Sequence, residues 1–133
     1  MHNIKRFDTK PYMTIGIIVV NIIVFVLMSI SGSTLDAQYM AAHGAMYPEY
    51  IKDGQYWRLL TSMFMHFGLM HILNNMVVLG AVGQIVEKAM GHVKLLITFL
   101  VSGMCGSVLS YIVMLYNNDF AVSAGASGAI FGL

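Results

Sequence analysis

Charged residues are scarce in this 133-residue chain and make up only 10% of it. Soluble globular proteins have about 25%. Hydrophobic residues reach 58%, and the mean hydropathy is +0.75. This balance argues against an ordinary soluble domain and predicts an integral membrane protein, with the lipid bilayer as its surroundings. The net charge of +1 is too small to indicate a nucleic-acid or acidic partner.

Cysteine is nearly absent as well. Cys105 is the only one, so no disulfide can form within the chain, and the residue reports nothing about the redox compartment. Because Cys105 lies in the middle of an apolar stretch, we expect it to be a buried small hydrophobic residue. No internal repeat stands out, and nothing in the sequence indicates an oligomeric state.

Three long stretches contain no Asp, Glu, Lys or Arg: residues 11–35, 59–86 and 95–118. Each exceeds the ~20 residues that a helix needs to cross ~30 Å of hydrocarbon. We expect spans at about 12–31, 68–86 and 93–116. A fourth apolar segment begins near Ala121 and continues to Leu133, which predicts the start of a fourth helix in which the sequence stops. The fold class is therefore an all-α polytopic membrane helix bundle.

The basic residues indicate how this bundle is oriented. Lys5, Arg6 and Lys10 precede the first span, and Lys88 and Lys94 lie between the second and the third. Basic residues concentrate on the cytoplasmic side, so the N-terminus is predicted to be cytoplasmic in a multi-pass protein of the cell membrane. An uncleaved first span is favoured over a signal peptide, because no A-x-A-like site follows it.

Two regions complete the predicted organisation. Residues 1–10 form a cytoplasmic tail, and residues 11–133 form one membrane domain. Its long first loop, about 32–57, mixes charges with aromatic and methionine side chains. We expect this loop to contain a partly structured element at the outer interface, where amphipathic rings prefer to lie.

Polar side chains interrupt the apolar stretch of the second span. They are His66, His71, Asn74 and Asn75, and lipid excludes such groups unless they have a use. His71 and Asn75 lie four residues apart and share one helix face, so both can donate hydrogen bonds to one point. Alternatively, the two histidines are haem ligands or satisfied donors between helices. Their spacing of five residues turns the rings about 140° apart, which argues against one shared metal.

The fourth segment contains Ser127 between Gly125 and Gly128. A serine becomes a nucleophile only beside a base, with donors aimed at the oxyanion that it creates. His71, Asn75 and the backbone N–H of Ser127 have the right depth to be those donors, and the two glycines leave room for a substrate backbone. By itself this short motif is also typical of a serine that packs between helices.

Together these motifs resemble the rhomboid intramembrane serine proteases. Trp57-Arg58 is similar to the family's WR pair, and residues 66–75 are similar to its H-x-x-x-x-H-x-x-x-N signature. Residues 125–128 resemble its GxSG nucleophile motif, and Glu87 resembles the acidic residue that closes its second span. The resemblance covers about residue 12 to the end.

The resemblance implies a bundle of six helices, of which three and the start of a fourth are present here. It implies peptide-bond hydrolysis in or next to transmembrane segments of other membrane proteins, without metal or cofactor. Ser127 would be the nucleophile and His71 and Asn75 the oxyanion donors. The supporting residues would be His66, Gly125, Gly128, Trp57, Arg58 and Glu87.

One feature of the family has no counterpart in this sequence. The family's general base is a histidine on the sixth span, and His2, His43 and His92 are not placed to replace it. We therefore expect this chain to be the N-terminal part of a protease that is inactive alone. The alternative is a catalytically inactive rhomboid-like protein that binds transmembrane helices.

Overall fold

The computed structural model describes residues 10–133, so the predicted tail lies almost entirely outside the described residues. Three long helices dominate: α1 (Tyr12–Ser31), α5 (Gly68–Met90) and α6 (His92–Asn117). The short elements are α2 (Ala37–Ala42), α3 (Pro48–Lys52), α4 (Arg58–Thr61), the 3₁₀ turn η1 (Ser62–Phe64) and α7 (Ser127–Phe131). In the described part of the chain no named strand occurs, and the predicted all-α fold is confirmed.

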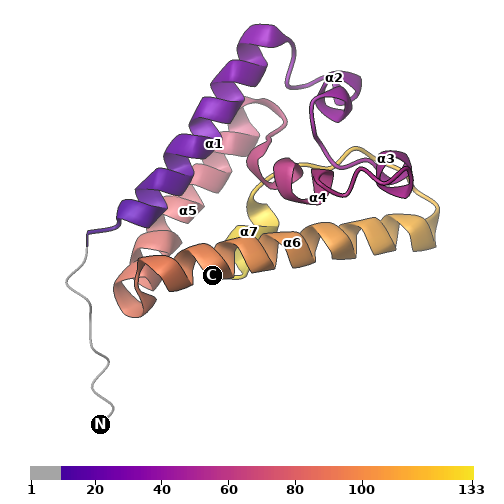
Figure 1. Ribbon diagram of the computed structural model, residues 1–133. Helices are drawn as coiled ribbons and strands as arrows, with labels where there is room; N and C mark the ends of the chain where they lie inside the picture. Colours follow the sequence, from indigo (N-terminus) through magenta and orange to yellow (C-terminus); the bar gives the residue numbers. More distant parts are fainter. Residues whose placement is uncertain (1–9) are drawn as a thin grey trace.

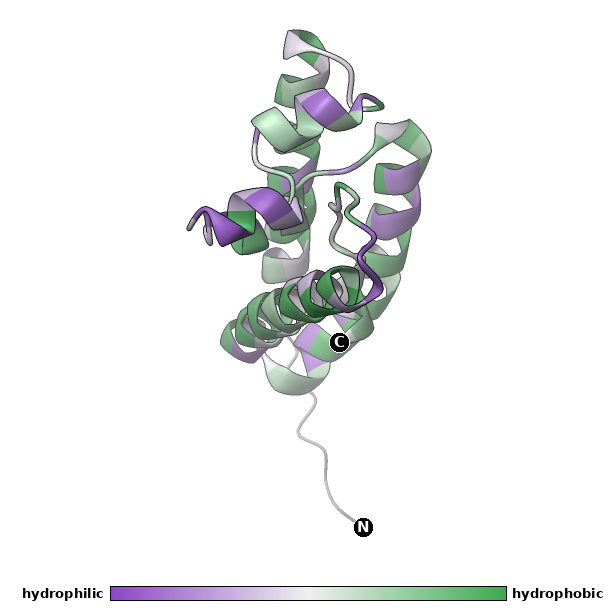
Figure 2. Ribbon diagram, turned by 90° about the vertical axis from the view of Figure 1, so that its right-hand side faces the viewer, coloured by the Kyte–Doolittle hydropathy of each residue, from purple (hydrophilic) through white to green (hydrophobic). Residues whose placement is uncertain are grey.

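The three long helices are each long and apolar enough to cross a membrane, as predicted. Their bounds differ from the expected ones by at most four residues, because α5 continues past Glu87 to Met90. Gly91, at a φ of +88°, then turns the chain directly into α6. In Figure 1, α1 and α5 run side by side, and α6 leaves the end of α5 at a steep inclination. Figure 2 shows the hydrophobic colour along these long helices.

The first loop is structured, as expected. It contains α2 and α3, and α4 follows it directly; all three lie between the far ends of α1 and α6 in Figure 1. Asp36 begins α2 by accepting hydrogen bonds from the backbone N–H groups of Gln38 and Tyr39, which would otherwise lack partners. Pro48 stands in the first turn of α3, where its missing N–H is not needed.

Two expectations were wrong. The fourth helix does not begin near Ala121 but at Ser127, because Ser123 forms an isolated bridge with Met46 and Gly125 has a φ of +125°. Neither conformation continues a helix, so 121–126 is a connecting segment. Cys105 is exposed on α6 rather than buried. No described residue covers this face of α6 at Cys105.

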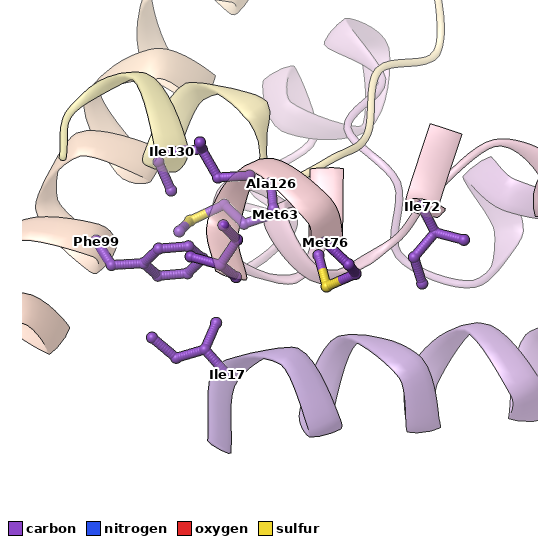
Figure 3. Packing of buried hydrophobic residues seen from close by; sticks show 9 residues of the cluster. Ile17, Met63, Ile72, Met76, Phe99, Ala126 and Ile130 are labelled. Atoms are coloured by element: carbon purple, nitrogen blue, oxygen red, sulfur yellow. The ribbon is translucent and has the colours of Figure 1, made fainter. Parts of the chain in front are cut away.

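A hydrophobic core joins the first, second and third long helices to α7. Figure 3 shows Ile17 of α1, Met76 of α5 and Phe99 of α6 converging with Met63 of η1 and Ile130 of α7. The core thereby fixes the helix that begins at Ser127 against the bundle.

Close approach between α6 and α7 depends on small residues. A methyl group added to Gly106 would lie 3.4 Å from the Cα of Gly128. The absence of a side chain at Gly106 therefore lets the backbones of α6 and α7 pack closely.

Glu87 connects the ends of the three long helices. Its side chain is fully buried, and its oxygens accept hydrogen bonds from the backbone N–H of Met13 (2.7 Å) and Thr14 (2.8 Å) and from the Thr14 hydroxyl (2.6 Å). His92 Nδ1, at the start of α6, is its fourth partner. The carboxylate therefore caps the N-terminus of α1, where unpaired N–H groups and the helix dipole favour a negative charge.

We expect Glu87→Ala to lower the free energy of unfolding by on the order of 3 kcal/mol, because it leaves the buried N–H of Thr14 and the partly buried N–H of Met13 without acceptors. Denaturation in mild detergent measures this value. Glu49→Ala is the matched control, since Glu49 is exposed on α3 and the change should stay within about 0.5 kcal/mol. Equal stability of both variants would contradict the role assigned to the Glu87 carboxylate.

Candidate active site

Arg58 links separate segments of the first loop by hydrogen bonds from its side chain. Its guanidinium is buried and donates to the carbonyls of Ala41 and Ala45, the latter at 3.0 Å, while its Nε donates to Gln55 Oε1 at 2.8 Å. The group also lies 4.7 Å from the ring centre of Trp57, which is exposed. Burial lowers the pKa of Arg58 from its ordinary value. An arginine stays charged at neutral pH regardless, so its donors remain available.

The segment ahead of Ser127 is attached to this loop by main-chain hydrogen bonds. Met46 and Ser123 exchange two of them, at 2.9 and 2.8 Å, and the N–H of Gly125 donates to the Ser62 carbonyl at 2.8 Å. The N–H of Ala126 donates to His66 Nε2 at 3.3 Å. These ties fix the backbone that leads into Ser127.

Sequence reasoning missed Met46, Ser62 and Ser123. Their contribution here is made by backbone groups, which have the same chemistry in every residue type. No side-chain signal in the sequence could have identified them.

His71 lies in the first turn of α5 and faces Gly125. Its Nδ1 accepts the N–H of Phe67 at 3.2 Å, which assigns the proton of the neutral ring to Nε2. A methyl group built on Gly125 would lie 2.9 Å from that Nε2 and 2.8 Å from Cε1. The donor nitrogen of His71 therefore lies against the backbone two residues before Ser127.

Asn75 is buried one turn further along α5. Its amide nitrogen donates to the carbonyl of His71 at 3.0 Å, so one of its two hydrogens is used within the helix. Asn74 is exposed. The structure thus places His71 and Asn75 on neighbouring turns, as expected from their spacing.

Ser127 is the first residue of α7, and its side chain is exposed. It lines a cavity of about 290 Å³ together with small residues of α6, among them Gly106, Ser107 and Ser110. His71 and Asn75 do not line this cavity. Ser127 therefore faces the cavity beside α6, while His71 of α5 contacts the chain at Gly125.

The sequence matches the model of the Rhomboid domain over residues 53–133. That match covers more than half of the chain and includes both the histidine motif and Ser127. The chain belongs to the rhomboid family. Its three spanning-length helices make this rhomboid a multi-pass membrane protein.

Curated relatives come from bacteria, plants and parasites. The chain is 37% identical over 123 residues to rhomboid protease GluP of Bacillus subtilis, covering 92% of this chain and 23% of GluP. It is 39% identical over 107 residues to RHOMBOID-like protein 7 of Arabidopsis thaliana, covering 80% of this chain and 32% of that protein. Rhomboid-like protease 2 of Toxoplasma gondii is 34% identical over 96 residues, or 72% of this chain and 33% of that protein. This rhomboid chain thus spans about a quarter to a third of these relatives.

The two histidines of this rhomboid form a pair with ring centres 5.1 Å apart. Each ring already accepts a backbone N–H with its unprotonated nitrogen, His66 at Nε2 and His71 at Nδ1. A haem or metal ligand needs that same lone pair. Among the described residues, no group of three His, Cys, Asp or Glu side chains is placed to hold a metal ion.

Gly125 is the position of the GxSG motif where an added methyl group costs most. A φ of +125° is strained for any L side chain, and the methyl group would press on His71. We expect Gly125→Ala to lower the free energy of unfolding by about 1–3 kcal/mol. Gly128→Ala is the control, because its methyl group would meet the Cα of Gly106 at an ordinary 3.7 Å. Equal loss of stability in the two variants would contradict the strain argument.

Proposed function

We propose that this rhomboid is an intramembrane serine endopeptidase that hydrolyses peptide bonds in or next to transmembrane segments of other membrane proteins. The observation that carries the proposal is the contact of His71 with Gly125, two residues before Ser127. It brings a hydrogen-bond donor of α5 to the backbone two residues before a serine that opens into a cavity. The similarity to a protein named as a protease, GluP, supports the same reading.

In the proposed reaction, the Ser127 hydroxyl oxygen attacks the carbonyl carbon of the substrate peptide bond, and a base takes the hydroxyl proton. The carbon–nitrogen bond then breaks, and the leaving amine receives that proton. Water attacks the resulting ester, which releases the second product as a carboxylic acid and restores Ser127. Two easier steps replace one difficult hydrolysis.

The oxyanion of this reaction needs donors that are already in place. We assign this role to Nε2–H of His71, to the backbone N–H of Ser127 at the start of α7, and to the second amide hydrogen of Asn75. His66, Arg58 and Trp57 would support the site through the first loop and the connecting segment. Gly125 and Gly128 would leave room for substrate, and Glu87 would stabilise the helices beneath it.

The base is not one of the two histidines described above. His66 and His71 each use their lone pair on a backbone N–H, so neither ring is free to take the Ser127 proton. By family resemblance, the base is a histidine of a later span.

The second candidate function is that of a catalytically inactive binding protein, in which no other residue replaces His66 and His71 as the base. A rhomboid in which no base reaches Ser127 would bind transmembrane helices without cutting them. The cavity beside Ser127 would then bind a helix of the partner rather than a peptide bond that is to be cleaved.

The proposed orientation places the N-terminus in the cytoplasm of a cell-membrane protein. Lys88 and Lys94 flank the turn between α5 and α6, which would then also be cytoplasmic. The start of α5, with His71, would lie toward the outer surface, where water can reach the reaction. The partners are transmembrane substrates within the bilayer.

The test uses the protein expressed from its complete gene and reconstituted in liposomes with a reporter transmembrane segment. We expect cleavage of the reporter, together with a fluorophosphonate adduct that mass spectrometry maps to Ser127. Reporter that co-purifies uncleaved, without any adduct, would reject the protease and support the binding protein. An adduct on a different serine would reject Ser127 as nucleophile.

A further inference from the structure

His66 is a fully buried polar side chain, and burying such a group costs free energy unless it forms hydrogen bonds. Only 1% of its surface is exposed, and it lies in the turn between η1 and α5. Its Nε2 accepts the N–H of Ala126 at 3.3 Å, a residue 60 positions further along the chain. The imidazole thereby links the beginning of α5 to the residue immediately before Ser127.

This hydrogen bond exists in only one protonation state of the ring. A neutral imidazole has one acceptor nitrogen, and accepting at Nε2 assigns the proton to Nδ1. A protonated imidazole donates from both nitrogens, so Nε2–H would face the N–H of Ala126 as donor against donor. Protonation would convert the attachment into a repulsion.

We propose that His66 is a positioning residue, which holds the backbone ahead of Ser127 while its imidazole is neutral and releases that segment when the ring is protonated. The inference rests on the proposed role of Ser127 as nucleophile. The other two ties of the segment, from Met46 to Ser123 and from Gly125 to Ser62, join backbone groups that do not titrate. His66 is thus the acid-sensitive one of the three.

The surroundings of His66 set the pH range of the release. Burial, and then the neighbouring His71, lower the pKa of His66 from 6.5 to about 4. In the described part of the chain, His71 is the titratable group that packs against the ring. Because the folded pKa is depressed, the attachment is fully present above pH 6.5 and weakens as the pH falls toward about 4.

Two substitutions separate the hydrogen bond from the volume of the side chain. His66→Leu fills similar space without an acceptor, whereas His66→Gln offers an amide oxygen near the position of Nε2 and does not titrate in this range. The measurements are hydrogen exchange of the peptide that spans 123–131 between pH 7 and pH 3.5, expressed as protection relative to the intrinsic rate at each pH, and the rate of fluorophosphonate labelling at pH 7. Both use the full-length protein in nanodiscs. His43→Leu is the control, since His43 is an exposed histidine of the first loop.

We expect His66→Leu to speed exchange in this peptide by at least about tenfold and to slow labelling at pH 7 by a similar factor. His66→Gln should restore both values and keep this peptide protected at pH 3.5, where we expect the unmodified protein to lose protection. Unchanged exchange in His66→Leu would overturn the proposal, and so would an equal loss of protection at pH 3.5 in His66→Gln and the unmodified protein. If no variant is labelled while exchange behaves as expected, the attachment is supported and the proposed nucleophile is rejected.

Discussion

Ser127→Ala is expected to lower the rate of reporter cleavage by about 10⁴-fold or more, because no other hydroxyl can form the ester intermediate from the same position. Removal of a nucleophile leaves only the contribution of binding and of the oxyanion donors. The fold should be unaffected, since the Ser127 side chain is exposed and α7 is held by the core around Ile130. Cleavage kinetics in liposomes measure the loss.

The control for this substitution is Ser110→Ala, because Ser110 lines the same cavity from α6. It should retain cleavage within a few-fold. If Ser127→Ala still cleaves the reporter at a comparable rate, Ser127 is not the nucleophile. If the variant no longer cleaves but retains the reporter during purification, binding and chemistry are separated as the proposal requires.

His71→Asn is expected to lower kcat by about 10²- to 10³-fold with little change in KM, the usual effect of losing one oxyanion donor. Asparagine was chosen because its side-chain oxygen can replace Nδ1 as acceptor of the Phe67 N–H. The substitution therefore keeps the turn at the start of α5 and removes only the donor at Nε2. A complete kinetic analysis with the reporter separates kcat from KM.

His71→Gln provides the complementary variant, because its amide nitrogen can reach toward the former Nε2 position. We expect it to recover part of the lost kcat. A large rise in KM at constant kcat in His71→Asn would assign His71 to ground-state binding. If cleavage requires an unprotonated Nε2 at His71, the tautomer inferred from the Phe67 hydrogen bond is wrong.

Much of the bundle was readable from the sequence because lipid imposes one simple condition. A span must be a helix of sufficient length with few charges, and each of the three uncharged stretches contains most of one such helix. Glu87 was recognised only through its resemblance to the acidic residue that closes the second span of the family. Its actual partners, Met13, Thr14 and His92, come from two other helices and had no recognisable spacing.

The connecting segment shows where such reasoning stops. Residues 121–126 have the apolar composition expected of a membrane-spanning helix, yet they form a non-helical connection that pairs with the first loop. Hydropathy does not distinguish the two conformations, because the deciding contacts are backbone hydrogen bonds to Met46 and Ser62. The burial of Cys105 was misjudged for a related reason: a position in the middle of a span does not say which face meets lipid.

The sequence by itself determined the class of this protein, its three spanning-length helices and the polar residues that are candidates for the site. These properties follow from composition and spacing, which are local. Only the tertiary structure decided that His71 faces Gly125, that His66 holds Ala126, and that the helix starts at Ser127. The physical reason is that each of these contacts joins segments more than fifty residues apart, and their geometry is set by how the helices pack.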